Sequence, residues 1–90
     1  MSEKSLTWIK LDEKQWLLIC IDFTIPLSIA QEKELMHKYG INFQSEGPII
    51  STSSYTWRSY RFWKSNNGTL TCQDKVIVEL MIMEAHKNDN

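Results

Sequence analysis

The chain has little of what marks several large classes of protein. Only Cys20 and Cys72 of its 90 residues are cysteines, so it is no disulfide-stabilised scaffold, and we expect both thiols to be reduced. Its formal net charge is only -1 and 42% of its residues are hydrophobic, a composition that excludes intrinsic disorder. The longest apolar run, residues 16–21, falls far short of the roughly 18 residues of a membrane-spanning segment.

The first residues also lack the apolar stretch and small-residue cleavage site of a signal peptide. We therefore expect a cytoplasmic protein without a membrane partner. Its length predicts one domain, residues 1–90, with a polar tail from about residue 86. Alanine, glycine, proline and arginine are scarce, whereas isoleucine, lysine and asparagine are frequent. This bias toward AT-rich codons indicates the genome of a phage, a mobile element or a low-GC bacterium.

The clearest local signal predicts a helix over residues 29–39. Ser28 and Gln31 have the spacing of a capping box, in which each residue satisfies a backbone N–H of the other. Gly40 supplies the left-handed residue that ends such a helix. One arc of the helix is apolar and is expected to pack on the sheet; it consists of Ile29, Leu35, Met36 and Tyr39.

Two strands are predicted ahead of this helix. Residues 7–11 alternate weakly, and residues 15–25 are β-branched, aromatic and apolar on both sides of the pleat. Such a pattern is typical of a strand that is covered on both faces, and Pro26 ends it. Asp22 lies within this run and is expected at an edge-facing or cavity-facing position.

Residues 55–64 and 70–84 are predicted to form a hairpin, because Asn67-Gly68 between them favours a type I′ turn. This register places Arg61 opposite Asp74. It assigns the face with Tyr55, Trp57, Ser59, Arg61 and Trp63 to the core in the part away from the turn. The other face, with cations and aromatics near the turn, carries Thr56, Arg58, Tyr60, Phe62 and Lys64.

The predicted fold class is α+β. An antiparallel sheet of four or five strands has one helix packed on one face, in the order β-β-α-β-β-β. Because the strands are apolar on both sides and one helix covers only part of one face, the remaining apolar surface requires a cover. A loop, a second copy of the chain or a target protein could supply it, and a homodimer or a bound partner is favoured.

The segment 55–64 is the leading candidate for a binding site. It holds both arginines, two of the four tryptophans and no acidic residue. Trp, Tyr and Arg dominate the hot spots of protein interfaces. The segment also fits an amphipathic strand with aromatics in the core and cations in water. The binding hypothesis assigns partner contacts to Arg58, Tyr60, Arg61, Phe62, Trp63 and Lys64.

The predicted function is that of a small non-enzymatic protein-binding module that acts by surface occlusion. An inhibitor of a host protein encoded by a phage or mobile element, or an immunity protein, fits this size. One alternative is binding of single-stranded nucleic acid by the same strand, because aromatics stack on bases and cations neutralise phosphates. An ion pair of Arg61 with Asp74 and the net charge weigh against it. A structural homodimer is the other alternative.

Catalytic and metal-binding patterns are not found. The hydroxyls of residues 51–54 have no histidine paired with them, and the three glycines form no phosphate-binding loop. The spacings of the cysteines and histidines match no zinc motif; these residues are Cys20, His37, Cys72 and His86. We therefore expect no enzyme, no catalytic residue, no metal and no cofactor.

Overall fold

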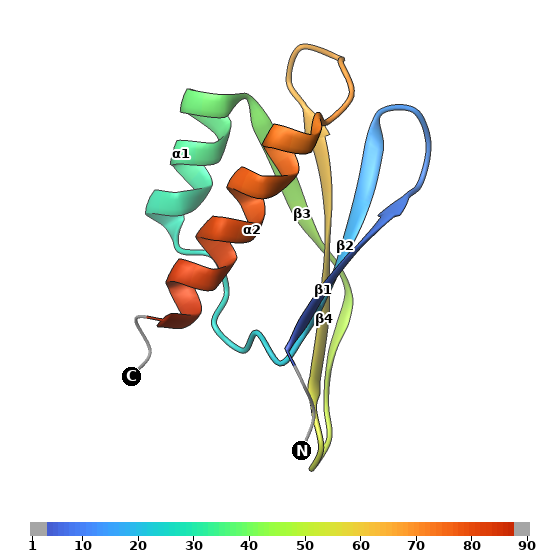
Figure 1. Ribbon diagram of the computed structural model, residues 1–90, viewed down its shortest axis with the longest axis vertical. Helices are drawn as coiled ribbons and strands as arrows, with labels where there is room; N and C mark the ends of the chain where they lie inside the picture. Colours follow the sequence, from blue (N-terminus) through green and yellow to red (C-terminus); the bar gives the residue numbers. More distant parts are fainter. Residues whose placement is uncertain (1–3, 88–90) are drawn as a thin grey trace.

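The computed structural model describes residues 4–87, in which a four-stranded antiparallel sheet packs against two helices (Figure 1). The strands lie in the order β1-β2-β4-β3, and each neighbouring pair is antiparallel. The predicted α+β class is confirmed. Along the chain the elements are β1 (Ser5–Lys10), β2 (Gln15–Ile21), α1 (Ile29–Tyr39), β3 (Ile41–Ser51), β4 (Thr56–Lys64) and α2 (Cys72–Lys87).

Helix α1 begins and ends where the sequence predicts. The Ser28 hydroxyl accepts a hydrogen bond from the Gln31 backbone N–H at 3.1 Å, and Gln31 Oε1 accepts one from the Ser28 N–H at 3.0 Å. These two bonds complete the capping box. Gly40 ends the helix with φ 66°, and its N–H donates to the free carbonyl of Met36 at 3.1 Å.

The predicted apolar arc of α1 is only partly right. Leu35 is fully buried and Tyr39 is half-buried, but Ile29 and Met36 are exposed to 73% and 40%. The helix lies at the margin of the core and also contacts α2, since the Gln31 side chain donates to a backbone carbonyl there. Its buried arc is therefore narrower and rotated toward α2.

The strand predicted over residues 70–84 is wrong, because this segment forms helix α2. Asn67 has the positive φ of 64° that the turn prediction requires, but Gly68 does not, so the tight hairpin turn does not form. Thr71 and Asp74 instead cap a helix: the Thr71 hydroxyl accepts from the Asp74 N–H at 3.1 Å, and Asp74 Oδ2 accepts from the Thr71 N–H at 2.9 Å. The Thr-x-x-Asp spacing is a helix signal that the hairpin prediction overlooked.

Helix α2 reads like a strand because it is apolar on two opposite sides. Its inner side enters the core with Val78, Met81 and Ile82. Its outer side carries Val76, Leu80 and Met83, which are exposed to 49%, 58% and 46%. A helix with apolar residues all round has no helical periodicity to read. His86 and Lys87 of the predicted tail belong to its last turn, and residues 88–90 lie outside the described residues.

Strand β2 ends earlier than Pro26, at Ile21. The next residue, Asp22, has φ 64°, a left-handed conformation that aspartate tolerates better than most residues. Its Oδ1 accepts from the Thr56 N–H at 2.9 Å, and its own N–H donates to the Thr56 carbonyl at 2.8 Å. The carboxylate therefore secures the exit of β2 to the start of β4.

Both helices cover the same face of the sheet (Figure 1). Side chains alternate across a strand, so every second residue of each strand points toward the helices. These residues form one core with the inner sides of α1 and α2. Its fully buried side chains include Leu18 and Cys20 of β2, Leu35 of α1, Ile41 of β3, Phe62 of β4 and Val78 of α2.

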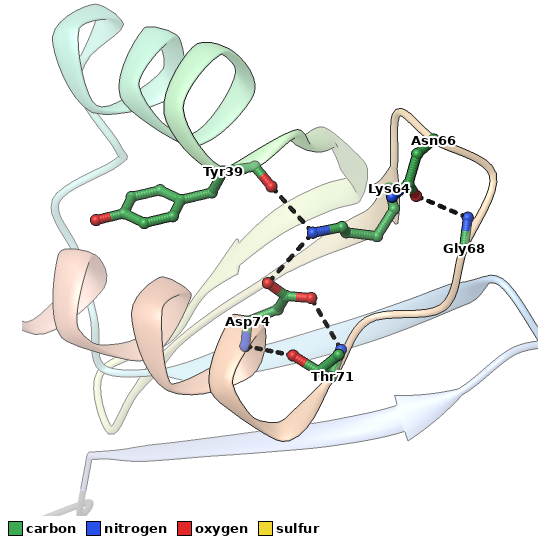
Figure 2. A network of polar contacts seen from close by, with 6 residues as sticks. All are labelled: Tyr39, Lys64, Asn66, Gly68, Thr71 and Asp74. Carbon is green, nitrogen blue, oxygen red and sulfur yellow. Dashed lines mark hydrogen bonds and ion pairs between the residues drawn. The ribbon is translucent and has the colours of Figure 1, made fainter.

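A polar network joins three elements at the edge of this core (Figure 2). Lys64 Nζ at the end of β4 donates to the backbone carbonyl of Tyr39 at 3.0 Å and to Asp74 Oδ1 at 3.4 Å. The predicted pairing of Arg61 with Asp74 is wrong, because Asp74 begins α2 on the helix side of the sheet. The pair of Lys64 and Asp74 instead links β4 to the end of α1 and the start of α2.

In the part of the chain that the structure describes, no helix has both the length and the apolar character needed to cross a membrane.

Candidate functional site

The candidate site is the sheet face opposite the helices, which we call the open face. No described helix or loop packs across it (Figure 1). It is formed by the side chains that alternate with the core residues of each strand. These are Ser5, Thr7 and Ile9 of β1, Gln15, Leu17, Ile19 and Ile21 of β2, Asn42, Gln44, Glu46 and Ile50 of β3, and Trp57, Ser59, Arg61 and Trp63 of β4.

One end of the open face and the part of it along β2 are apolar. Ile21 of β2 pairs with Trp57 of β4, which pairs in turn with Ile50 of β3, so three large apolar side chains form a row across the sheet. Ile19 and Leu17 continue this surface along β2 and are half-buried only by their neighbours on the face. Ile50 is exposed to 47%. The result is a continuous apolar area that is exposed to solvent.

Charge on the open face is balanced. Arg61 and Glu46 are the charged residues among the strand positions of this face, and their side chains form an ion pair at 3.5 Å, with 31% and 39% exposure. Arg61 Nη1 also donates to Gln15 Oε1 at 3.1 Å. These contacts hold the guanidinium over β4 between its two neighbouring strands.

The other end of the open face is hollowed. A depression of about 290 Å³ lies between the β1–β2 turn and the loop that follows β4. Its lining carries an indole, amides and cations and no carboxylate; the residues are Lys14, Gln15, Gln44, Arg61, Trp63, Lys64 and Asn67. The open face is therefore asymmetric, apolar at one end and rich in hydrogen-bond donors at the other.

The structure divides the predicted site residues between the two faces of β4. Arg61 and Trp63 lie on the open face. Tyr60 and Phe62 are 4% and 0% exposed in the core, so the expectation that they lie on a free surface is wrong. The helices pack on the side of β4 that carries Tyr60 and Phe62, whereas the hairpin register predicted that the other side would be buried.

The remaining two predicted residues also point toward the helices. Arg58 Nη2 donates to the Thr24 carbonyl at 2.9 Å, and Lys64 belongs to the polar network with Asp74. Arg58 thus binds the loop after β2, and Lys64 binds the end of α1 and the start of α2.

The sequence prediction missed the part of the open face that lies on β2. Leu17, Ile19 and Ile21 form most of its apolar area, yet only β4 was selected as a binding site. A signal was present, since the run 15–25 is apolar on both sides of the pleat. This pattern indicates that both faces of the strand are covered. It does not show which face is covered by the protein's own helices.

The two cysteines have opposite environments. Cys20 is fully buried, and this burial raises the pKa of its thiol from 9.0 to about 12, although the neighbouring Arg58 guanidinium acts in the opposite direction. Cys72 is exposed at the start of α2. Among the residues that the structure describes, no three histidine, cysteine or acidic side chains gather as a metal site would require.

The raised pKa of Cys20 predicts a loss of stability at alkaline pH. Above about pH 9 the unfolded thiol ionises while the folded one keeps its proton, so the unfolded state binds fewer protons and stability falls as pH rises toward 12. Because the unfolded thiol is only half ionised at pH 9 and the slope reaches about 1.4 kcal/mol per pH unit only above it, wild type should lose about 1.6 kcal/mol more than Cys20→Ala between pH 9 and pH 10.5. Urea unfolding at the two pH values measures this difference. Equal losses in both proteins would contradict the prediction.

Comparison of the chain with models of known families, with curated proteins and with solved structures finds no match. The function is therefore inferred from the chain's own residues.

Proposed function

We propose that the protein is a non-enzymatic binding module whose open face docks on the surface of another protein. The observation that supports this proposal is the uncovered apolar area on the four-stranded sheet, which consists of Leu17, Ile19, Ile21, Trp57 and Ile50. Protein interfaces combine such an apolar centre with a polar rim. Trp57, Trp63 and Arg61 are also of the types that dominate binding hot spots.

Docking of this kind would act by occluding the partner's surface. Within this proposal, the protein is an inhibitor of a host protein or an immunity protein. A phage or mobile-element origin and a cytoplasmic location also stay predictions.

The distribution of cations argues against the alternative of nucleic-acid binding. A nucleic acid on the open face would meet Lys14 at the hollow and Arg61 of β4, and Arg61 is already paired with Glu46. Arg58 and Lys64 lie on the opposite side of the strand and are bonded there. Binding to a phosphate backbone draws on several unpaired cations along one groove.

The asymmetry of the open face argues against a second copy of the chain as its occupant. In a two-fold pair of open faces the axis lies in the plane of the interface. If it runs along the strands, the two hollows meet and Lys14 and Arg61 approach their own copies. If it runs across the strands, each hollow covers the apolar end with Ile21 and Trp57, and the Lys14 ammonium is buried without a carboxylate. A different protein avoids both costs.

Photo-crosslinking in the organism that makes the protein tests the proposal. A benzophenone amino acid is placed at Ile19 on the open face, at Leu80 on the outer side of α2, or at the exposed Lys33 of α1. We expect one protein adduct that forms at Ile19, forms at least tenfold less at Lys33, and is lost when Trp57→Ala is added. Circular dichroism confirms that each variant is folded.

The other outcomes separate the alternatives. Adducts with nucleic acid at Ile19 would favour the nucleic-acid alternative, and adducts of the chain with itself would favour the homodimer. Adducts that form at Leu80 and not at Ile19 would move the interface to α2. Any of these results, or equal adducts at all three positions, would overturn the proposal.

A further inference from the structure

The hollow at the donor-rich end of the open face has a chemistry of its own. Its lining residues include two with cationic side chains, three with side-chain amides and one with an indole; these are Lys14, Arg61, Gln15, Gln44, Asn67 and Trp63. Lys64 also borders it, but the Lys64 ammonium is bonded on the other side of the sheet. A cavity of about 290 Å³ has room for one large side chain and its neighbours on a partner.

Most of these donors have no partner within residues 4–87. Gln15 accepts from Arg61 through Oε1, which leaves both N–H groups of its Nε2 free. The side chains of Lys14, Gln44 and Asn67 form no hydrogen bond or ion pair in the same part of the chain. The hollow therefore offers free donors, and its acceptors are fewer.

The acidic groups around the hollow are already occupied. Glu46 pairs with Arg61, and Glu13 pairs with Lys10 at 3.3 Å. Asp12 Oδ1 accepts from the backbone N–H groups of Lys14 and Gln15 at 2.7 and 2.8 Å. Among residues 4–87, the Lys14 ammonium therefore forms no ion pair with any of these carboxylates.

We propose that this hollow is a carboxylate-recognition subsite, which takes an aspartate or glutamate side chain of the protein that docks on the open face. A carboxylate offers up to four acceptor positions and suits the free amide and ammonium donors, with Arg61 as a further charge. Trp63 packs against the aliphatic part of the same side chain. A basic partner side chain meets the repulsion of the Lys14 and Arg61 cations here, and the acceptors it finds are the neutral amide oxygens of the lining. The inference rests on the proposed function, since it names the chemistry of that partner.

Selection from a random peptide library tests the subsite without knowledge of the natural partner. The peptides are displayed through their C-termini, so every carboxylate comes from a side chain. Binders are selected on wild-type protein and counter-selected on the open-face variant Ile19→Lys. We expect selected sequences to contain apolar residues beside aspartate or glutamate, with acidic residues at least threefold more frequent than in the starting library.

Affinities of the strongest selected peptide then locate the carboxylate. Lys14→Glu reverses the charge at the hollow, and Gln44→Glu replaces an amide donor with an acceptor of the same shape. Each should weaken binding at least tenfold. Lys33→Glu makes the same charge change on the outer side of α1 and should alter the affinity less than twofold.

The possible failures are distinguishable. Binders that require Ile19 but carry no acidic excess, or that bind Lys14→Glu and Gln44→Glu as well as wild type, would overturn the subsite and leave the proposed function standing. A library that gives no binders, or only binders insensitive to Ile19→Lys, would count against both.

Discussion

Replacing Phe62 with alanine is expected to lower the free energy of unfolding by about 4 kcal/mol. Phe62 is fully buried near the end of β4, and the centroid of its ring lies 5.4 Å from that of Trp8 and 5.6 Å from that of Phe43. Truncation removes these contacts and leaves a cavity that a close-packed core fills only in part. Equilibrium urea unfolding, followed by circular dichroism, measures the loss.

The neighbouring substitution Trp63→Ala is the control, because it truncates a large aromatic on the other side of the same strand. Trp63 lies on the open face and keeps contact with water, so its loss should cost no more than half as much. The hairpin register predicted from the sequence puts Phe62 on the outward face, where its loss would cost little. A larger loss for Trp63→Ala than for Phe62→Ala would therefore show that β4 faces the other way.

Removal of the Asp74 carboxylate is the second large effect, and Asp74→Ala should cost about 4 kcal/mol. Two contributions add up. The side chain caps α2 through the Thr71 N–H. Its loss also leaves the ammonium of Lys64, whose side chain is 16% exposed, with the Tyr39 carbonyl as its one partner among residues 4–87 (Figure 2). A charge that is buried and unpaired costs far more than an exposed one.

Two further variants separate this effect from a general sensitivity to charge. Glu13→Gln breaks the exposed pair with Lys10 and should change stability by less than about 0.5 kcal/mol. The double variant Lys64→Met/Asp74→Asn keeps an acceptor for the cap and removes the buried ammonium, so it should recover at least half of the loss. A cost of less than about 1 kcal/mol for Asp74→Ala would mean that the network contributes little.

Elements that depend on short-range signals could be predicted from the sequence. Helix α1 has its start and end fixed by Ser28, Gln31 and Gly40, whose hydrogen bonds span at most a few residues. The existence of β2 follows from its β-branched run. Such signals determined the α+β class and indicated that the strands require cover on both faces.

Helix α2 could not be recognised from its apolar pattern, because Val76, Leu80 and Met83 are exposed on one side while Val78 and Ile82 are buried on the other. Its identity depends on the cap at Thr71 and Asp74, which competes with the hairpin turn at Asn67-Gly68. In the fold the cap is reinforced by Lys64, whose ammonium also holds the end of α1. This tertiary contact favours the helix.

The candidate site shows the same division. The sequence alone determined that residues 55–64 carry aromatics and cations on both sides of a strand, and that the apolar surface exceeds what one helix covers. Only the tertiary structure decided that both helices pack on the side of Tyr60 and Phe62 and leave Arg61 and Trp63 on the open face. The physical reason is that a strand has a period of two, so a pattern with apolar residues at both phases fits either orientation, and packing against distant elements selects one.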